Sequence, residues 1–247
     1  MTDLPTQARY SFGILTFFDP TSGEIMDQMA PITFYDDFLG AGHTAIPSVA
    51  TAGAYWGSKI VNTAGTVTVD AVANGANGQV ALVTDATNEA QEAVLYCLDE
   101  RAFNAAAALV YETRIQCGAI PTGGTQAVVG MATAWVAAQA ETAYLRFALN
   151  GNGHLLAQCY DGTNTFSVDT GIVVATTTEW RLLRIDASDP TNVLFYVDGD
   201  WVCRSTIFTF GATGTAAQMQ PFASVAKASG TSVGTLNIDF ISIASGR

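Results

Sequence analysis

The stretch RLLRIDASDPTNVLFYVDGDWVC, residues 181–203, determines the fold class that we expect for this chain. Apolar side chains between positions 193 and 197 alternate between two faces, as they do in a β-strand. Asp198-Gly199 then falls where a hairpin must reverse, because this dipeptide accepts the positive φ of a tight turn. Asp200 forms the polar edge of the same turn, and Trp201 begins the return strand. The stretch therefore predicts a strand–turn–strand hairpin in which Asp198 needs no ligand.

The same signals recur along most of the chain. Asn-Gly and Asp-Gly dipeptides separate short runs that are rich in Val, Ile, Thr, Phe and Tyr. Many strands with hairpin turns and little helix predict an all-β sandwich or barrel. We expect strands at residues 32–39, 66–71, 80–83, 93–98, 109–116, 127–136, 143–149, 155–160, 165–168, 179–186, 193–197, 201–205, 219–226 and 235–243.

Three segments depart from this pattern. Residues 85–99 combine a good N-cap with apolar residues at helical spacing, so we interpret them as a loop or short helix that turns into a strand. Residues 102–108 are rich in alanine and are compatible with another helical turn. Residues 1–30 form an N-terminal arm or hairpin ahead of a sandwich at 31–247.

The N-terminal segment carries four aromatic residues, which we expect to be buried against another surface. One interpretation is that they pack on the chain's own sandwich, and the other is that they form an assembly contact with a neighbouring subunit. The residues concerned are Tyr10, Phe12, Phe17 and Phe18.

Composition excludes several classes of partner. Charged residues make up 13% of the 247 positions, about half of the roughly 25% typical of soluble domains. The formal net charge is −12 and no Lys/Arg cluster exists, which argues against nucleic acid and anionic membranes. The N-terminus lacks the features of a signal peptide, so we expect synthesis in the cytoplasm. A surface this poor in charge favours contact with other subunits, and we expect a homo-oligomer.

Cysteine and histidine spacing predicts neither metal nor cofactor. No CxxC pair occurs, so free buried thiols are expected, with disulfides as the alternative. A calcium site at Asp186 and Asp189 is a weaker alternative, because calcium needs several convergent oxygen ligands. The residues concerned are Cys97, Cys117, Cys159, Cys203, His43 and His154.

No catalytic constellation is evident from the sequence. Residues 230–234 match G-x-S-x-G, but a predicted strand follows them and both histidines precede them. A glycosidase needs two carboxylates that flank the bond. Glu112 is the one acid in its strand and suggests a surface pair with Arg114, whereas Asp36 and Asp37 are adjacent and point to opposite faces. We therefore expect no catalytic residues and no enzymatic activity.

Residues 31–247 resemble the concanavalin A-like, or laminin G-like, domains. Three stretches carry the resemblance: ITFYDDFLG at 32–40, EWRLLRIDASDPTNVLFYVDGDWV at 179–202 and TLNIDFISIA at 235–244. The resemblance implies a two-sheet antiparallel jelly-roll sandwich whose closing strand lies beside the opening one. It also implies a tailed-phage virion protein, since domains of this kind with a short N-terminal extension are common there.

The main functional expectation is a non-enzymatic capsid decoration protein of a tailed bacteriophage, made in the host cytoplasm and located in the virion. Its partners would be capsid or other virion proteins. One alternative is a phage fibre or receptor-binding module that binds host glycans, and another is a glycan hydrolase on the same fold. For the glycan alternative, the resemblance implies an aromatic platform beside polar loop residues. The candidates are Trp56, Tyr160, Asp161, Asp200 and Trp201.

Overall fold

The computed structural model confirms an all-β, two-sheet antiparallel sandwich. Only two short 3-10 segments, η2 (Ala137–Gln139) and η3 (Gly214–Ala216), interrupt the strands of the described chain. The side chains of residues 7–18 are not described. The structure describes residues 7–11, 14–18, 32–39, 46–49, 51, 54–72, 78–119, 121–122, 124–174 and 178–246.

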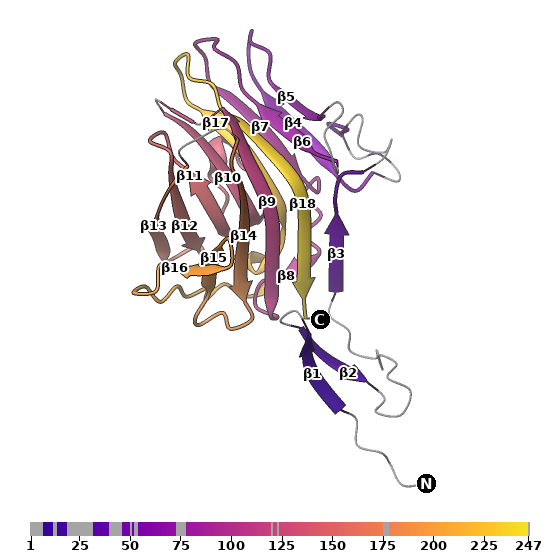
Figure 1. Cartoon of the computed structure of the whole chain (residues 1–247). Helices are drawn as coiled ribbons and strands as arrows, with labels where there is room; N and C mark the ends of the chain where they lie inside the picture. The colour runs from indigo at the N-terminus through magenta and orange to yellow at the C-terminus, as the bar shows by residue number, and fades with distance from the viewer. Residues whose placement is uncertain are drawn as a thin grey trace.

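Two sheets lie face to face, and the chain crosses between them repeatedly (Figure 1). The first sheet runs, in spatial order, β13 (Thr165–Val173), β12 (His154–Tyr160), β11 (Tyr144–Leu149), β10 (Thr125–Ala132), β17 (Gln218–Lys227), β7 (Gln91–Tyr96) and β4 (Gly57–Val61), with β8 (Phe103–Asn104) beside β17. The second sheet runs β16 (Asp200–Val202), β15 (Leu194–Val197), β14 (Trp180–Ala187), β9 (Leu109–Ala119), β18 (Thr235–Ser245), β6 (Val80–Val83) and β5 (Thr68–Ala71), with β3 (Ile32–Asp36) beside β18. The closing strand thus lies beside the opening one, as the resemblance implied.

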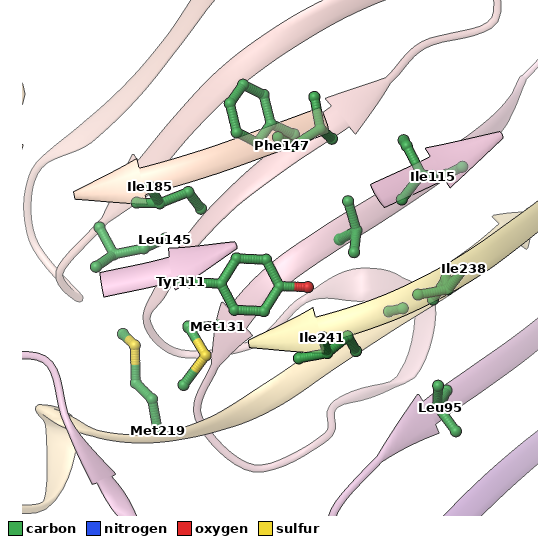
Figure 2. Close-up of a cluster of buried hydrophobic side chains, with 14 of the residues drawn as sticks. Leu95, Tyr111, Ile115, Met131, Leu145, Phe147, Ile185, Met219, Ile238 and Ile241 are labelled. Carbon is green, nitrogen blue, oxygen red and sulfur yellow. The ribbon is translucent and has the colours of Figure 1, made fainter. Parts of the chain in front are cut away.

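The core fills the space between the sheets because alternate residues of every central strand point inward. Figure 2 shows Leu145 and Phe147 of the first sheet meeting Tyr111 and Ile185 of the second. The ring of Phe195 lies 5.3 Å from that of Phe147 and 4.8 Å from that of Phe208, measured between centroids. The four cysteines are unpaired; three are buried and Cys203 is half-buried.

The hairpin expected at residues 193–202 is confirmed. β15 pairs with β16, and Asp198 and Gly199 between them have φ values of 52° and 88°. The Asp198 carboxylate accepts hydrogen bonds from the Leu182 amide at 2.9 Å and from Arg181 at 2.8 Å. Turn geometry and these local bonds account for the aspartate.

Residues 85–99 contain a loop that leads into a strand, which confirms one of the two expected forms, and the short helix is wrong because tertiary packing overrides the local spacing. β7 occupies the centre of this segment, and every one of its residues is buried. The acids that resembled a helix start bind a neighbouring loop instead. Glu89 accepts hydrogen bonds from the amides of residues 63–65, and Asp85 accepts one from Thr66.

Other boundaries also differ from the expected ones. The alanine-rich segment 102–108 contains β8 and a turn rather than a helix, and β4 was not expected from the sequence. The strand expected at 127–136 ends at Ala132, after which the chain leaves the first sheet.

The N-terminal segment contains a separate two-stranded hairpin. β1 (Gln7–Ser11) and β2 (Ile14–Phe18) pair antiparallel with each other, and among the described strands they pair with no other. Of the four expected contact residues, Phe12 lies outside the described residues and the other three are described by their backbone alone. The division into an arm at 1–30 and a sandwich at 31–247, and the assembly role of the arm, stay predictions.

Deleting residues 1–30 should leave the sandwich folded, because both described strands of that segment pair only with each other. We expect the melting temperature to change by less than about 2 °C, against the roughly 2–4 °C that a 1 kcal/mol loss produces in a domain of this size. Calorimetry of the full and shortened chains measures this. A shortened chain that fails to fold would assign the N-terminal aromatics to the core.

Phe195→Ala should destabilise the protein by roughly 3–5 kcal/mol, since it removes a large buried side chain and leaves a cavity. Ile207→Ala is the matched control, because Ile207 is 67% exposed. Urea unfolding of both variants measures the difference. Equal midpoints would contradict the placement of Phe195 in the core.

Candidate functional site

The outer face of the first sheet, which points away from the core, carries a buried network of polar side chains. Strand alternation places Glu92 on β7, Ser224 on β17 and Arg146 on β11 on this face. Residues 133–143, which include η2, lie over them. Glu92 is 2% exposed and Arg146 is 6% exposed. The covering segment therefore removes charged groups from water on a sheet face that could otherwise be solvated.

Glu92 fixes the covering segment to the sheet. Its carboxylate accepts hydrogen bonds from the Ala138 amide at 3.0 Å and from the Trp135 indole at 3.3 Å. It also accepts one from the Ser224 hydroxyl at 3.0 Å. The Gln139 side-chain amide in turn donates to that hydroxyl at 3.2 Å. Both carboxylate oxygens of Glu92 are thus occupied.

Arg146 is the cation of the network. It donates to the Glu141 carboxylate at 2.9 Å, to the Gln139 carbonyl at 3.2 Å and to the Gln158 side chain at 2.8 Å. Its guanidinium also lies 3.7 Å from the centre of the Tyr144 ring. Such cation–π and charge-assisted contacts gain strength when water is excluded.

Burial shifts the protonation of both acids toward the neutral form. It raises the pKa of Glu141 to about 7, an effect that Arg146 opposes and the nearby Glu92 reinforces. Burial also raises the pKa of Glu92, against the hydrogen bonds that it accepts. One oxygen of Glu141, Oε1, has no hydrogen-bond partner although it is buried. Two coupled carboxyl groups with raised pKa values are an arrangement that acid–base catalysis uses.

A polar ladder continues from Arg146 toward the solvent-exposed edge of the sheet. Gln158 on β12 donates to the Ser167 hydroxyl on β13 at 3.1 Å, and the three residues are cross-strand neighbours. Two residues along β11 and β12 from Arg146 and Gln158, on the same face, Tyr144 pairs with Tyr160, and their ring centroids are 5.5 Å apart. Both tyrosines are partly exposed and Ser167 is exposed. The two tyrosine rings thus lie beside the planar side-chain groups of Arg146 and Gln158.

The structure does not bring the five expected glycan-binding residues together. Tyr160 belongs to the site just described. Trp56 is 3% exposed and donates to Asp36 at 2.7 Å, so its ring faces are not available to a ligand. Asp161 is buried and holds its own turn, accepting from the amides of Thr163 and Asn164 at 2.8 and 2.7 Å.

The remaining two, Asp200 and Trp201, lie on β16 at the edge of the other sheet. The expected surface pair of Glu112 and Arg114 is also wrong. Arg114 pairs with Asp239 at 3.0 Å, whereas Glu112 lies 3.6 Å from Arg184.

The described part of the chain has neither a metal-binding cluster nor a membrane-spanning helix. No group of three or more His, Cys, Asp or Glu residues there could hold a metal ion. Asp189, considered for calcium, accepts bonds from the amide and hydroxyl of Thr191 in a local turn. No helix within the described ranges has the length and apolar character to cross a membrane.

Comparison with known proteins shows the fold. No family model and no curated protein sequence matches the chain. Among solved structures, the chain is similar to a GH16 protein of Bacteroides ovatus from a mixed-linkage glucan locus, solved with its product. The identity is 10%, the TM-score is 0.59, and the match covers 85% of this chain and 99% of that one.

Two further structures match over similar lengths. One comes from work on endo-acting O-glycanases of human gut microbiota that initiate mucin breakdown, with 12% identity, a TM-score of 0.57 and coverage of 86% and 98%. The other is a pseudo β-1,3-glucanase and immunostimulatory antigen of Mycobacterium tuberculosis, with 16% identity, a TM-score of 0.54 and coverage of 87% and 98%. The concanavalin A-like jelly roll is therefore confirmed.

These similarities contradict the expectation that the chain is not an enzyme. Glycoside hydrolases occur among proteins that match it over most of their length. Two acids at alternate positions of one strand are evident in a sequence, and this chain shows no such pair. Glu92 on β7 and Glu141 in the covering segment come from distant segments, and only the fold brings them onto one face.

Glu141→Gln should change the pH dependence of stability. The folded-state pKa of about 7 lies above the reference value of 4.5, so the folded protein binds this proton more tightly than the unfolded chain. Wild-type stability should fall as the pH rises from about 4.5 to 7, by roughly 3 kcal/mol at 1.4 kcal/mol per pKa unit.

The variant should lose much of that slope, since glutamine does not titrate. Urea unfolding from pH 4 to 8 measures it, with Glu100→Gln as the control because Glu100 is exposed. Parallel stability curves for wild type and Glu141→Gln would contradict the raised pKa.

Proposed function

We propose that this protein binds a polysaccharide on the outer face of the first sheet, at the Tyr144–Tyr160 pair. The observation that carries the proposal is the placement of these rings beside the Arg146–Gln158–Ser167 ladder. Aromatic faces contact the apolar faces of sugar rings, while a few fixed polar groups orient the ligand. The ladder is held by hydrogen bonds across three strands, so little ordering is needed on binding.

The glycoside hydrolases that share the fold support a carbohydrate-related role. The capsid decoration role expected from the sequence finds no such support among the matched structures. The glycan-binding alternative is therefore the better proposal. A phage fibre or receptor-binding setting, a homo-oligomer and a virion location stay proposals that rest on the sequence resemblance.

Tyr160→Ala should weaken polysaccharide binding about tenfold, because it removes one of the two paired rings at the centre of the site. Native gels that contain soluble mixed-linkage β-glucan, mucin glycans or laminarin measure the retardation of the protein. Ile207→Ala, an exposed apolar position, is the control. Retardation that is equal for Tyr160→Ala and wild type would place the glycan elsewhere.

Hydrolysis of the bound glycan is the second candidate function, favoured by the coupled acids Glu141 and Glu92. A carboxyl group with a pKa near 7 is protonated in part at neutral pH and could donate to the leaving oxygen, while the second carboxylate acts as base or nucleophile. Glu92 lies beneath residues 133–143 and Glu141 belongs to that segment, so hydrolysis requires the segment to shift far enough to admit the glycan while both acids stay on one face.

Glu141→Gln and Glu92→Gln should each reduce the release of reducing sugar by about 100-fold or more, since each removes an acid–base group. Glu100→Gln should retain wild-type turnover. The assay uses the glycan that binds best in the gels. Turnover that survives in both variants would assign the chemistry to other residues.

A further inference from the structure

A second set of aromatic and charged residues forms one row across the second sheet. The register pairs Trp201 with Tyr196, Tyr196 with Arg184, and Arg184 with Glu112. It continues from Glu112 to Ser242 and from Ser242 to Tyr35. The row therefore crosses six neighbouring strands: β16, β15, β14, β9, β18 and β3.

This row faces away from the core. Its neighbours along the strands, including Phe195, Ile185 and Tyr111, are buried between the sheets, and successive side chains of a strand point to opposite faces. Trp201 is 40% exposed at one end and Tyr35 is 63% exposed at the other. Five interstrand spacings separate these two ends, a distance of about 24 Å.

The middle of the row is hollowed. Leu182, Arg184, Asp186, Tyr196 and Glu112 line a surface cavity of about 320 Å³, together with Gly199. This volume is at the lower end of the range of small-molecule sites. Tyr196 lines the hollow, and its register partner Trp201 lies on the next strand.

The charges in the hollow favour a neutral ligand. Arg184 lies 3.3 Å from Asp186 and 3.6 Å from Glu112, so two carboxylates surround one guanidinium. Both contacts are long for charge-assisted hydrogen bonds, which leaves donor capacity on Arg184 for a ligand. An anionic ligand would meet a local excess of negative charge on a chain whose net charge is −12. Hydroxyl groups can accept from the arginine and donate to the acids at the same time.

We propose that this row is a second saccharide-binding surface, which holds a linear neutral glycan across the strands of the second sheet. Trp201 would stack on a sugar at one end and Tyr35 on a sugar at the other, with hydroxyl groups of an intervening unit held by Arg184 and Glu112. The inference rests on the proposed function for the class of ligand. It adds a separate surface on the opposite side of the sandwich.

Native affinity gels with soluble mixed-linkage β-glucan test the proposal. Trp201→Ala should weaken binding about tenfold and Tyr35→Ala several-fold, because each removes an exposed aromatic contact. Arg184→Gln should weaken it as well, and Ile207→Ala should not. Polygalacturonate, which is anionic, should neither retard the protein nor compete. Equal melting temperatures show that the variants are folded.

The double variant Tyr160→Ala/Trp201→Ala separates this surface from the first. Each single variant should keep residual binding, and the double variant should lose it. If Tyr160→Ala alone abolishes binding while Trp201→Ala and Tyr35→Ala match wild type, the second surface is refuted and the proposed function stands. If only the Trp201 and Tyr35 variants lose binding, the second surface stands and the first is refuted. Absence of glucan binding by wild type, or equal binding of polygalacturonate, overturns the second surface.

Discussion

The hydrogen bonds of the Glu92 carboxylate are the interaction on which the candidate site depends. This acid is placed in the centre of a sheet, on the face turned away from the core, and it anchors the segment that covers that face. Removing one partner of a buried charged network leaves an unsatisfied ion, which costs far more than a surface hydrogen bond contributes. The covering segment, Arg146 and Glu141 are therefore linked by shared contacts, so displacing one of them costs hydrogen bonds of the others.

This linkage explains why the two faces of the first sheet differ in character. The inner face packs apolar side chains against the second sheet, as in any sandwich. The outer face carries a smaller apolar cluster around Val94, Val128 and Phe222, with the polar network beside it. From that network the ladder leads outward to Ser167, and the tyrosine pair lies beside it on β11 and β12. A buried polar network and a partly exposed aromatic pair thus belong to one continuous set of contacts, which is how a binding site is pre-organised.

Local sequence signals predicted the fold class, because a hairpin is formed by strands and a turn that are consecutive in the sequence. Asp198-Gly199, with alternating apolar residues before it, predicted both the turn and its strands, and the structure confirms them. For segment 85–99 the local pattern left a loop and a short helix before the strand as alternatives, since its helical spacing results from burial on both faces of β7. The site depends on pairings that join distant positions, such as Glu92 with Ser224, and no local pattern specifies them. Trp56 is a further example of a contact that the sequence does not specify. Nothing in the neighbouring sequence indicates that its indole is buried against Asp36.

The most direct test of the central claim is a backbone amide NMR titration with an oligosaccharide of mixed-linkage β-glucan. We expect saturable shifts at the amides of Tyr144, Gln158, Tyr160 and Ser167, which lie on three adjacent strands of the first sheet. The core strand residues Leu82 and Leu95, buried between the sheets and distant from both proposed surfaces, should not shift. Saturation of binding with no change at the four site amides would contradict the assignment of the glycan to this face.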